Sequence, residues 1–571
     1  MRAASIYVVA AWIVVQVASL LFPAIDVPDS SLRFVWLTSA AIFPLVIIFA
    51  WMYDISLDGV SRTLPARPDD DFDPSLRRLD LVLLAVLLVV SISVALQFAS
   101  RIELGFDDYT IAVLPLDDLS GNLDEQYFVS GMQASIISGL SRISRLRVTS
   151  KASTQQFRNA SLPLEQIAAQ LGVSRIVEGT VLRNNNIVSI AIRLMNARSG
   201  EQVWSARFED QLENIMVLQA RIAQEIAARV HVRMEPAELE QFDAAQAVNP
   251  EAYLAFLRGV FHVERFNPED MTIAATHFQR AVDIDPEYAL GYWGLSKLCV
   301  FQAQAGMLTP DEAREQCMPP VRKALELDPF LPEAYLGLAG ISAWQSFDWE
   351  AAQRNFERAI ALNPSYAEAH MFYSHFLGII GELEKSTYHI ETAVALDPLN
   401  PFLRGLYSIQ LVMVNQYEDA ITEAEAALGA APGYAFGHTT LILAHDALGN
   451  HDEAVEAFAN KMRFVGGNPE AAQMLEAVYA QLGYEGAMLQ MANALEQASV
   501  SDYVPSMRIA TLYEQGGDYE KAMTWYESAL DLRDPNVPYV GVNTKNPEMR
   551  RHPRFKELLL ELGLDYWAEN L

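Results

Sequence analysis

The residues that most often carry out catalysis are present in this chain of 571 residues, but their spacing matches no familiar reaction centre. Its ten histidines are scattered, and the closest two, His370 and His375, are five residues apart, which is not the spacing of paired metal ligands on a helix. The sequence also lacks a phosphate-binding glycine loop, a GxSxG turn and an HExxH pair. We therefore predict no catalytic residue, no metal site and no cofactor, and we expect that the protein is not an enzyme.

The two cysteines, Cys299 and Cys317, are too few for a disulfide framework. Cys317 stands at the small-residue position of a repeated helix, and Cys299 lies late in the helix expected before it. We interpret both as small buried thiols. The alternative is a disulfide, because an exported domain would allow the two residues to pair.

A pattern of four residues recurs along the chain at a period of about 34 residues. Each copy has a small residue, then an apolar residue, an alanine and a proline at fixed intervals. Three consecutive copies are Ala352, Phe356, Ala359 and Pro364; Ser386, Ile390, Ala393 and Pro398; and Ala420, Ala424, Ala427 and Pro432. This is typical of the second helix of a tetratricopeptide hairpin, where the small residue permits close helix contact and the proline ends the hairpin. An ordinary bundle of amphipathic helices is the alternative, but a bundle has no reason to keep these residues in phase.

Further copies on both sides predict about eight helical hairpins between residues 250 and 535, followed by a C-terminal cap at residues 536–571. One hairpin cannot bury its apolar face alone, so stacked neighbours share a continuous core and curl into a superhelix with a concave groove. The expected fold of this part is an α-helical tetratricopeptide (TPR) solenoid.

The concave groove is the predicted binding site. The first helix of each TPR hairpin lines this groove, and bulky in-phase residues there are Trp344, Met371, His375, Phe402 and Ile409. A lining of aromatic residues and methionine suits an extended or helical peptide, so we expect a protein or peptide partner. The alternative is that several of these side chains only pack between repeats.

Three apolar stretches, at residues 6–25, 34–53 and 81–99, are each close to the length that crosses a bilayer. They predict three transmembrane helices in a membrane module at residues 1–100. A signal peptide is the alternative for the first stretch, but that stretch is long, contains Trp12 and Gln16, and is soon followed by the second.

Basic residues near the ends of these stretches predict their orientation, because cytoplasmic loops are enriched in Lys and Arg. Only Arg33 and Arg101 flank the stretches on the exported side, whereas the expected cytoplasmic side carries Arg2, Arg62, Arg67, Arg77 and Arg78. We therefore expect an inner-membrane protein of a Gram-negative cell, with the chain after about residue 100 in the periplasm.

The formal net charge of −31 argues against a nucleic-acid partner. Binding to phosphates requires clustered Lys and Arg, and the sequence contains no basic stripe. The oligomeric state is left open by the sequence.

Residues 108–234 have a different pattern, in which segments of alternating apolar and polar residues are separated by helical runs. Strand signals include IAVLPL, RIVEGTVLR and IVSIAIRLMN, and the polar residues 184–186 predict a hairpin tip between the last two. A helical run at residues 163–171 is stopped by Gly172. These signals predict a small α/β domain ahead of the repeats.

The order of short motifs in this domain resembles the TolB-like amino-terminal domain found before TPR arrays in bacterial proteins. The matching positions are residues 119–121, Phe128 with Gly131, residues 140–143 and 171–173, Glu178 with Gly179, and Trp204. The apolar stretches and the ending HPRFKELLLELGL are also similar to this family. The resemblance implies a membrane-anchored TolB-like and TPR architecture, but no shared chemical site.

Related proteins of this kind often carry an output module ahead of the first span, such as a winged helix, a nucleotide cyclase or a kinase. Here only residues 1–5 precede the first expected span, so we expect none of these modules. The sequence thus predicts a periplasmic interaction scaffold or sensor. The alternative is a signal-transducing membrane subunit that relays a periplasmic stimulus to a separate cytoplasmic effector.

Overall fold

The computed structural model describes residues 53–56, 59–62, 109–120, 125–158, 160, 162–243, 248–263, 268–304 and 306–571, which fall into two compact units, Met1–Leu104 and Gly105–Leu571. In the first unit, strands β1 (Tyr53–Ser56) and β2 (Gly59–Arg62) pair antiparallel. The expected spans lie outside the described residues, except that Tyr53 begins β1. Among the residues described, no helix has both the length and the apolar character needed to cross a bilayer.

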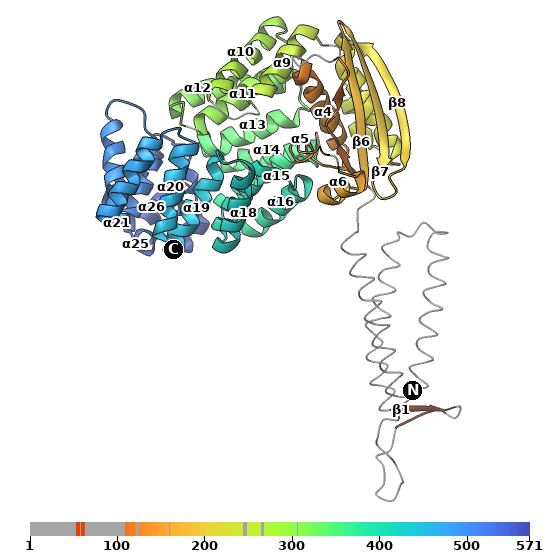
Figure 1. The fold of residues 1–571 in the computed structure, drawn as a ribbon. Helices are drawn as coiled ribbons and strands as arrows, with labels where there is room; N and C mark the ends of the chain where they lie inside the picture. Colours follow the sequence, from red (N-terminus) through yellow and green to blue (C-terminus); the bar gives the residue numbers. More distant parts are fainter. Residues whose placement is uncertain are drawn as a thin grey trace, which may run out of the picture. The chain divides into compact units, whose positions relative to one another are not determined.

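The second unit begins with a six-stranded mixed sheet in the order β5-β3-β6-β7-β8, with β4 beside β6 (Figure 1). Strand β3 pairs parallel with β5 and β6, whereas β6, β7 and β8 form an antiparallel meander. The strands are β3 (Thr110–Val113), β4 (Asp117–Asp118), β5 (Arg147–Val148), β6 (Arg175–Asn184), β7 (Ile187–Asn196) and β8 (Gln202–Gln211). The hairpin expected at residues 184–186 is confirmed, and Asn185 has the positive φ that such a turn favours.

Helices cover the sheet unequally. Helices α4 (Gln126–Ser141) and α7 (Ile215–Arg229) bury their apolar residues against one face. The short helices α5 (Lys151–Gln155) and α6 (Leu164–Leu171) cover part of the other face, next to β3 and the start of β6. Gly172 ends α6 with a left-handed φ of 66°, as the sequence predicted. The expected α/β segment is therefore confirmed.

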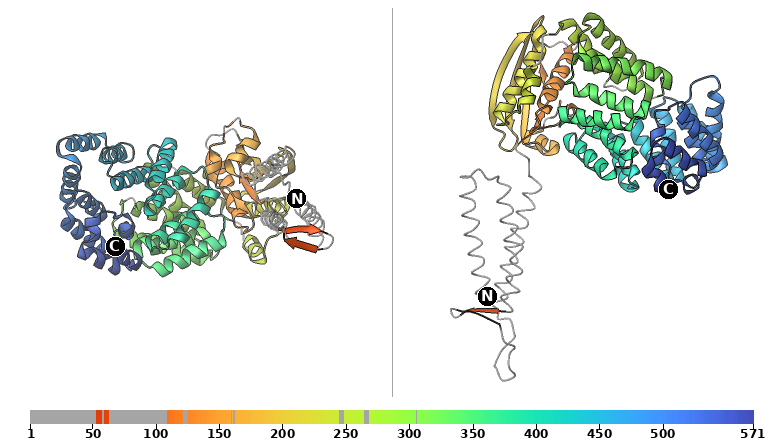
Figure 2. Two further views of the ribbon diagram at one scale, coloured as in Figure 1. Left: turned by 90° about the horizontal axis from the view of Figure 1, so that it is seen from below. Right: turned by 180° about the vertical axis from the view of Figure 1, so that it is seen from behind.

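Eight helix pairs follow in the described part of the chain, as the repeat period predicted (Figures 1 and 2). Their helices are α9 (Pro250–Val263) and α10 (Pro268–Ile284); α11 (Ala289–Gln304) and α12 (Pro310–Leu327); α13 (Pro332–Ile341) and α14 (Trp349–Leu362); α15 (Ala367–Ile379) and α16 (Leu383–Leu396); α17 (Pro401–Met413) and α18 (Tyr417–Ala430); α19 (Ala435–Leu448) and α20 (His451–Phe464); the two halves of α21 (Pro469–Ala498); and α22 (Ser506–Gln515) and α23 (Tyr519–Asp531). The seventh pair is divided by Gly483, which has a φ of 70° that most other residues would adopt only at a cost.

The predicted register of the repeats is confirmed by burial. Ala352, Phe356 and Ala359 are fully buried in α14, and the ring of Phe356 stacks on that of Tyr373 in α15. Close approach elsewhere depends on glycine: a Cβ at Gly294 in α11 would lie 2.4 Å from the ring of Phe278 in α10. The small positions of the pattern therefore let neighbouring helices meet around large side chains.

The α/β segment and the array belong to one compact unit. The link runs through turns between repeats. The Ser153 hydroxyl donates to the Asp397 carboxylate over 2.5 Å, and the Ser365 hydroxyl donates to the Leu146 carbonyl over 2.8 Å. Asp397 is buried, which raises the pKa of its carboxyl, although the bond from Ser153 opposes that rise. Helix α8 (Pro236–Asp243) joins this contact region, because Glu238 accepts from the Ser144 backbone amide.

The chain's last segment packs against the eighth helix pair and also reaches back along the array. It forms η4 (Val537–Tyr539), α24 (Val540–Asn543), α25 (Pro547–Arg550), α26 (Pro553–Glu561) and α27 (Asp565–Glu569). Helix α24 contacts α15 and α17, so the segment returns from the eighth pair to the fourth and fifth. Figure 2 shows the C-terminus beside the blue end of the array. Helix α26 also contacts α23 of the eighth pair, where the Arg554 guanidinium donates to the Glu527 carboxylate over 2.7 Å, so the segment covers the last pair as well as the middle of the array.

Candidate partner-binding surfaces

The five residues predicted to line the groove do not form an open surface. Trp344, Met371, His375 and Ile409 are 5, 1, 1 and 7% exposed, and all four belong to the main hydrophobic core of the array or contact it. Phe402 is partly buried among aromatic rings. The structure thus favours the alternative, in which these side chains pack between repeats, and corrects the predicted groove.

The C-terminal segment, residues 536–571, is what covers these positions. The ring of Tyr539 lies 6.5 Å from that of His375, and Val540 and Val542 are fully buried in the same core. His375 also bonds through Nε2 to the Leu406 carbonyl over 3.0 Å. Burial lowers the pKa of His375 to about 4, so this imidazole is neutral and structural.

Three hydrogen bonds hold this segment and the residues just before it against the middle of the array. The indole of Trp567 donates to the Ile379 carbonyl over 2.7 Å, and the indole of Trp349 donates to the Leu562 carbonyl over 2.9 Å. Arg533 donates to the Ser346 carbonyl over 2.7 Å. Each bond satisfies a backbone carbonyl near a helix end, so the segment completes the array and is not a loose tail.

An accessible surface of a different kind lies on the sixth helix pair. Phe436 in α19 is 36% exposed, and Phe464 in α20 is 56% exposed. About one turn along each helix from these rings, the Lys461 ammonium donates to the Thr439 hydroxyl over 2.8 Å. Positions 436 and 439, and positions 461 and 464, are each three residues apart, so each pair shares a helix face. We call Phe436, Thr439, Lys461, Phe464 and Arg508 the aromatic-basic patch.

The two cations of the aromatic-basic patch have no acidic partner within the described part of the chain. Lys461 is partly buried, and burial, followed by the nearby Arg508 guanidinium, lowers its pKa to about 8. Arg508 is exposed at the start of α22. A carboxylate placed between these cations would relieve both effects, because an opposite charge favours the charged form of each group. The patch therefore fits a ligand with an acidic group next to apolar side chains.

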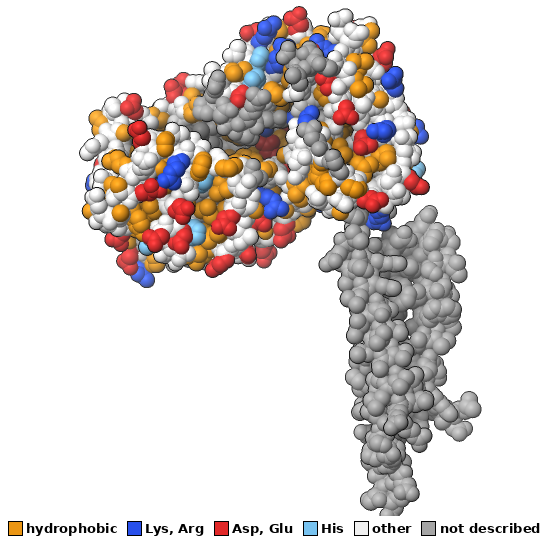
Figure 3. Space-filling view, viewed as in Figure 1, with side chains coloured by type: hydrophobic (Ala, Val, Ile, Leu, Met, Phe, Trp, Pro, Cys, Tyr) orange, Lys and Arg blue, Asp and Glu red, His pale blue; other side chains and the backbone are white. Residues whose placement is uncertain are grey.

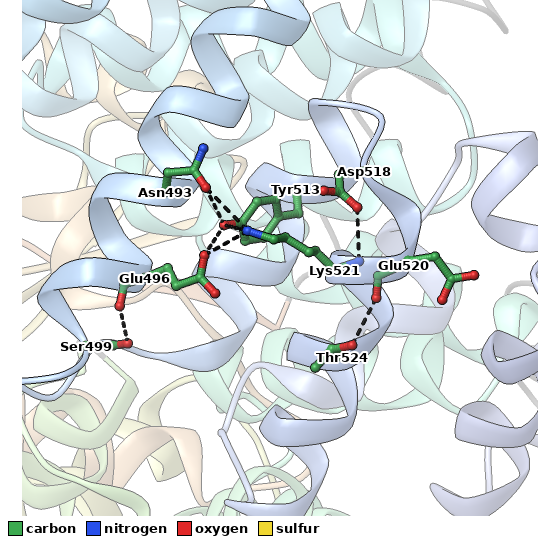
Figure 4. A network of polar contacts seen from close by, with 8 residues as sticks. All are labelled: Asn493, Glu496, Ser499, Tyr513, Asp518, Glu520, Lys521 and Thr524. Atoms are coloured by element: carbon green, nitrogen blue, oxygen red, sulfur yellow. Dashed lines mark hydrogen bonds and ion pairs between the residues drawn. The ribbon is translucent and has the colours of Figure 1, made fainter.

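A polar cluster near the C-terminal end of the array is structural (Figure 4). The Lys521 ammonium lies 2.9 Å from the Tyr513 hydroxyl and 3.1 Å from the Glu496 carboxylate, and Tyr513 also donates to Glu496. The bonds to Tyr513 and Glu496 raise the pKa of Lys521, so its amine stays protonated and is not a nucleophile. Asp518 caps α23 at the Lys521 backbone amide. The cluster ties the seventh pair to the eighth.

The cysteine interpretation is wrong. Cys299 in α11 and Cys317 in α12 form a disulfide, and both are buried in one small apolar cluster. Sequence spacing could not decide this, because the two residues lie on successive helices whose packing brings them together.

The two histidines closest in sequence stay apart, as expected. His370 has its Nδ1 2.9 Å from that of His389 and its Nε2 3.2 Å from the Pro364 carbonyl, whereas His375 turns to Leu406. Burial lowers the pKa of both His370 and His389, so one neutral ring can donate to the other.

Charge over the array follows the acidic composition. On the face seen in Figure 3, Asp and Glu are scattered over the array, and Lys and Arg form no stripe among the described residues. This distribution agrees with the argument against nucleic acid.

Family models match three parts of the chain. Tetratricopeptide repeat models match residues 338–401 and 506–536. The HilA/YgeH-like transcriptional regulator, second domain, matches residues 107–225, where we expected a TolB-like domain from the sequence. The chain therefore contains tetratricopeptide repeats, an architecture whose stacked helices form extended binding surfaces for protein or peptide partners.

Two curated proteins are similar to parts of the chain. The Putative adenylate cyclase 3 of Rhizobium meliloti (strain 1021) is 28% identical over 237 residues, which is 41% of this chain and 40% of that protein. The Hsp70-Hsp90 organizing protein of Triticum aestivum is 33% identical over 78 residues, 14% of this chain and 13% of that protein. The chain thus spans well under half the length of the curated relatives it matches.

Several solved TPR structures are also similar. A thermophilic TPR protein of Thermus thermophilus is 19% identical and covers 32% of this chain and 92% of its own, with a TM-score of 0.26. Pseudomonas aeruginosa pilF is 18% identical and covers 40% and 97%, with a TM-score of 0.28. Yeast Tom70 is 16% identical and covers 61% and 83%, with a TM-score of 0.33.

Proposed function

We propose that this protein is a membrane-anchored periplasmic TPR scaffold or sensor without catalytic activity of its own, and that it captures a protein partner at the aromatic-basic patch. The observation that carries the proposal is the pair of exposed aromatic rings, Phe436 and Phe464, beside two cations that lack acidic partners in the described residues. Exposed aromatic residues and arginine are typical of the residues that dominate binding energy at interfaces.

The patch favours a peptide with an acidic group flanked by apolar residues. A formal net charge of −31 repels an acidic ligand from most of the chain, so such a ligand would bind at cations that lack an acidic partner in the described residues, such as Lys461 and Arg508.

The disulfide supports the periplasmic location. Disulfides persist in exported proteins and are rare in the cytosol, and Cys299 and Cys317 are paired. The topology is tested with reporter fusions in intact cells. A periplasm-active reporter fused after residue 105 should be active, and one fused near Asp70 should be silent; the reverse pattern would place the array in the cytoplasm and refute this part of the proposal.

The binding site is tested by photocrosslinking in intact cells. A photoreactive residue at Phe464 should give a defined adduct, and Lys461→Glu with Arg508→Glu should abolish it while the circular dichroism spectrum stays unchanged. Val500, which is 88% exposed in the turn after α21, is the matched control position and should give no adduct. Equal adducts at Phe464 and Val500, or adducts that survive the charge reversal, would contradict the assignment.

A second candidate is a signal-transducing subunit that relays a periplasmic stimulus to a separate cytoplasmic effector. It is favoured by the similarity of parts of the chain to a transcriptional regulator domain and to a protein named as a putative adenylate cyclase. If the protein is a transducer, substitutions around Pro44, which lies in the expected second span at residues 34–53, should abolish the cellular response while partner capture at the aromatic-basic patch survives. Loss of both together would speak for a scaffold.

The resemblance of residues 108–234 to TolB-like domains remains part of the proposal. It supports a bacterial envelope location, as it accompanies the expected membrane module. Purified protein should show no cyclase activity. An activity that consumes a nucleoside triphosphate and co-purifies with the protein would refute the non-enzymatic assignment.

A further inference from the structure

Strand β8 (Gln202–Gln211) is a long free edge of the sheet. It pairs only with β7 and is the last strand in the strand order. No described helix or strand lies beyond it in the views of Figures 1 and 2. Its sequence has no proline and no lysine, and its one irregularity, at Val203, lies at its start. Soluble proteins usually protect such an edge with proline, charged side chains or bulges. In β8 the bulge lies only at Val203, and the exposed charges, Arg207 and Glu209, can be paired by a strand of matching pattern, so residues 204–211 can accept a further strand.

The hydrogen-bonding directions of β8 follow from its register. The Leu212 amide donates to the carbonyl of Asn186, the residue directly opposite on the β7 side. Because the pattern alternates along a strand, residues 210, 208 and 206 also direct their backbone amides and carbonyls toward β7. The residues between them, Ser205, Arg207 and Glu209, therefore turn their amides and carbonyls outward. The Gln211 amide bonds to its neighbour Asp210, which ends the run of free amides.

The side chains along this edge are complementary to themselves. When a second β8 is placed antiparallel with Phe208 opposite its own copy, Arg207 lies opposite Glu209 of the second copy, and the same pair recurs across the twofold axis. Arg207 and Glu209 are exposed, and neither has an ion-pair partner in the described part of the chain. In this register Arg207 and Glu209 are also the residues whose backbones point outward, so each side-chain pair coincides with a pair of backbone hydrogen bonds.

Neighbouring registers are less favourable. A shift that places Arg207 opposite its own copy sets two like charges side by side, which is destabilising. A shift that places Ala206 on the axis sets Arg207 opposite Ser205 and Glu209 opposite the irregular Val203. Charge therefore selects the register centred on Phe208. The Phe208 side chain itself lies on the helix-covered face of the sheet, where the Arg221 guanidinium lies 5.6 Å over its ring.

We propose that β8 is a self-association edge, through which two copies of this chain pair antiparallel around Phe208 and join their sheets into one. The occupant is a second copy because the charge pattern is symmetric about one residue, a property that no unrelated strand would need to share. This inference does not depend on the proposed function.

The test is sedimentation velocity of the full-length chain in detergent, as a function of concentration. The unaltered chain should form a dimer. Arg207→Glu and Glu209→Arg should each weaken the dimer by about tenfold or more, because each turns two attractive pairs into repulsive ones, and the double swap Arg207→Glu with Glu209→Arg should restore it. Arg322→Glu, which makes the same charge change at an exposed position in α12, is the matched control and should leave the dimer unchanged.

A second variant tests the backbone bonds without altering charge. Ser205→Pro removes an outward amide that β7 does not use, so the sheet should remain folded by circular dichroism while the dimer weakens. A monomer at every concentration would leave the edge to another partner and overturn self-pairing. A dimer that is indifferent to these substitutions, or that the double swap fails to restore, would also overturn it, because the contact would then lie elsewhere.

Discussion

Replacing Glu514 with glutamine should stabilise the protein above pH 7 and leave its stability unchanged near pH 4.5. Glu514 in α22 is only 7% exposed, and its carboxylate accepts hydrogen bonds from Tyr526 in α23 and from Thr544 in the C-terminal segment. Burial, helped by the nearby Asp446 in α19, raises the pKa of this carboxyl from 4.5 to about 7, although the hydrogen bonds from Tyr526 and Thr544 and the charge of Arg550 in α25 oppose the rise.

The sign follows from proton linkage. The folded state holds the Glu514 proton more tightly than the unfolded chain, so this proton supports folding fully below pH 4.5. As the pH rises from 4.5 to about 7, the unfolded chain releases the proton more readily, and stability falls by about 1.4 kcal/mol per pH unit. The total loss is about 3 kcal/mol and stays constant above pH 7. Glutamine mimics the protonated acid and cannot ionise, so it escapes the loss.

The assay is urea unfolding of the protein between pH 4.5 and pH 8, followed by far-ultraviolet circular dichroism. The difference between Glu514→Gln and the unaltered protein should grow across this window to about 3 kcal/mol. The matched control is Glu557→Gln, which removes an exposed carboxylate in α26 and should show no such growth. A Glu514→Gln variant that is destabilised at pH 8, or a difference that does not change with pH, would refute the reasoning.

Two further outcomes test the array. Phe356→Ala removes a fully buried ring and should lower the free energy of unfolding by about 3 to 5 kcal/mol, whereas Tyr388→Ala, at a side chain that is 63% exposed, should change it by about 0.5 kcal/mol at most; an unchanged melting curve for Phe356→Ala would mean that the repeat register is wrong. The double variant Cys299→Ser with Cys317→Ser should lose about 3 kcal/mol, because the disulfide closes a loop with a sequence separation of 18, and a reducing agent should lower the melting temperature of the unaltered protein but not of this variant. Two titratable thiols in protein isolated without reductant would contradict that pairing.

Much of the fold could be predicted because its signals are local. The repeat pattern around Phe356 places a small residue, a large one and an alanine on one face of a helix, and that periodicity alone predicts which face is buried. In the same way, Gly172 predicts a helix end and Asn185 predicts a hairpin turn, because few other residues adopt a positive φ at low cost.

The binding surface could not be predicted in this way. The sequence shows that Trp344 and His375 occupy bulky first-helix positions, but not that Tyr539, from far along the chain, covers them. The residues that remain accessible, Phe436 and Phe464, were not singled out; their one sequence signal is an aromatic residue at a position where the repeat pattern does not require one. That signal is weak, because a single apolar residue on a helix surface is common.

The sequence by itself determined the elements of this protein: the strands of the α/β segment, the eight helix pairs of the described residues, and the apolar face of each. Only the tertiary structure decided which of these faces meet. Tertiary packing forms the disulfide between Cys299 and Cys317, and it places the Trp567 indole within hydrogen-bonding distance of the Ile379 carbonyl. It also makes β8 the edge strand of the sheet. The physical reason is that periodicity records where apolar side chains lie on one element, whereas burial depends on a second surface that is distant in sequence.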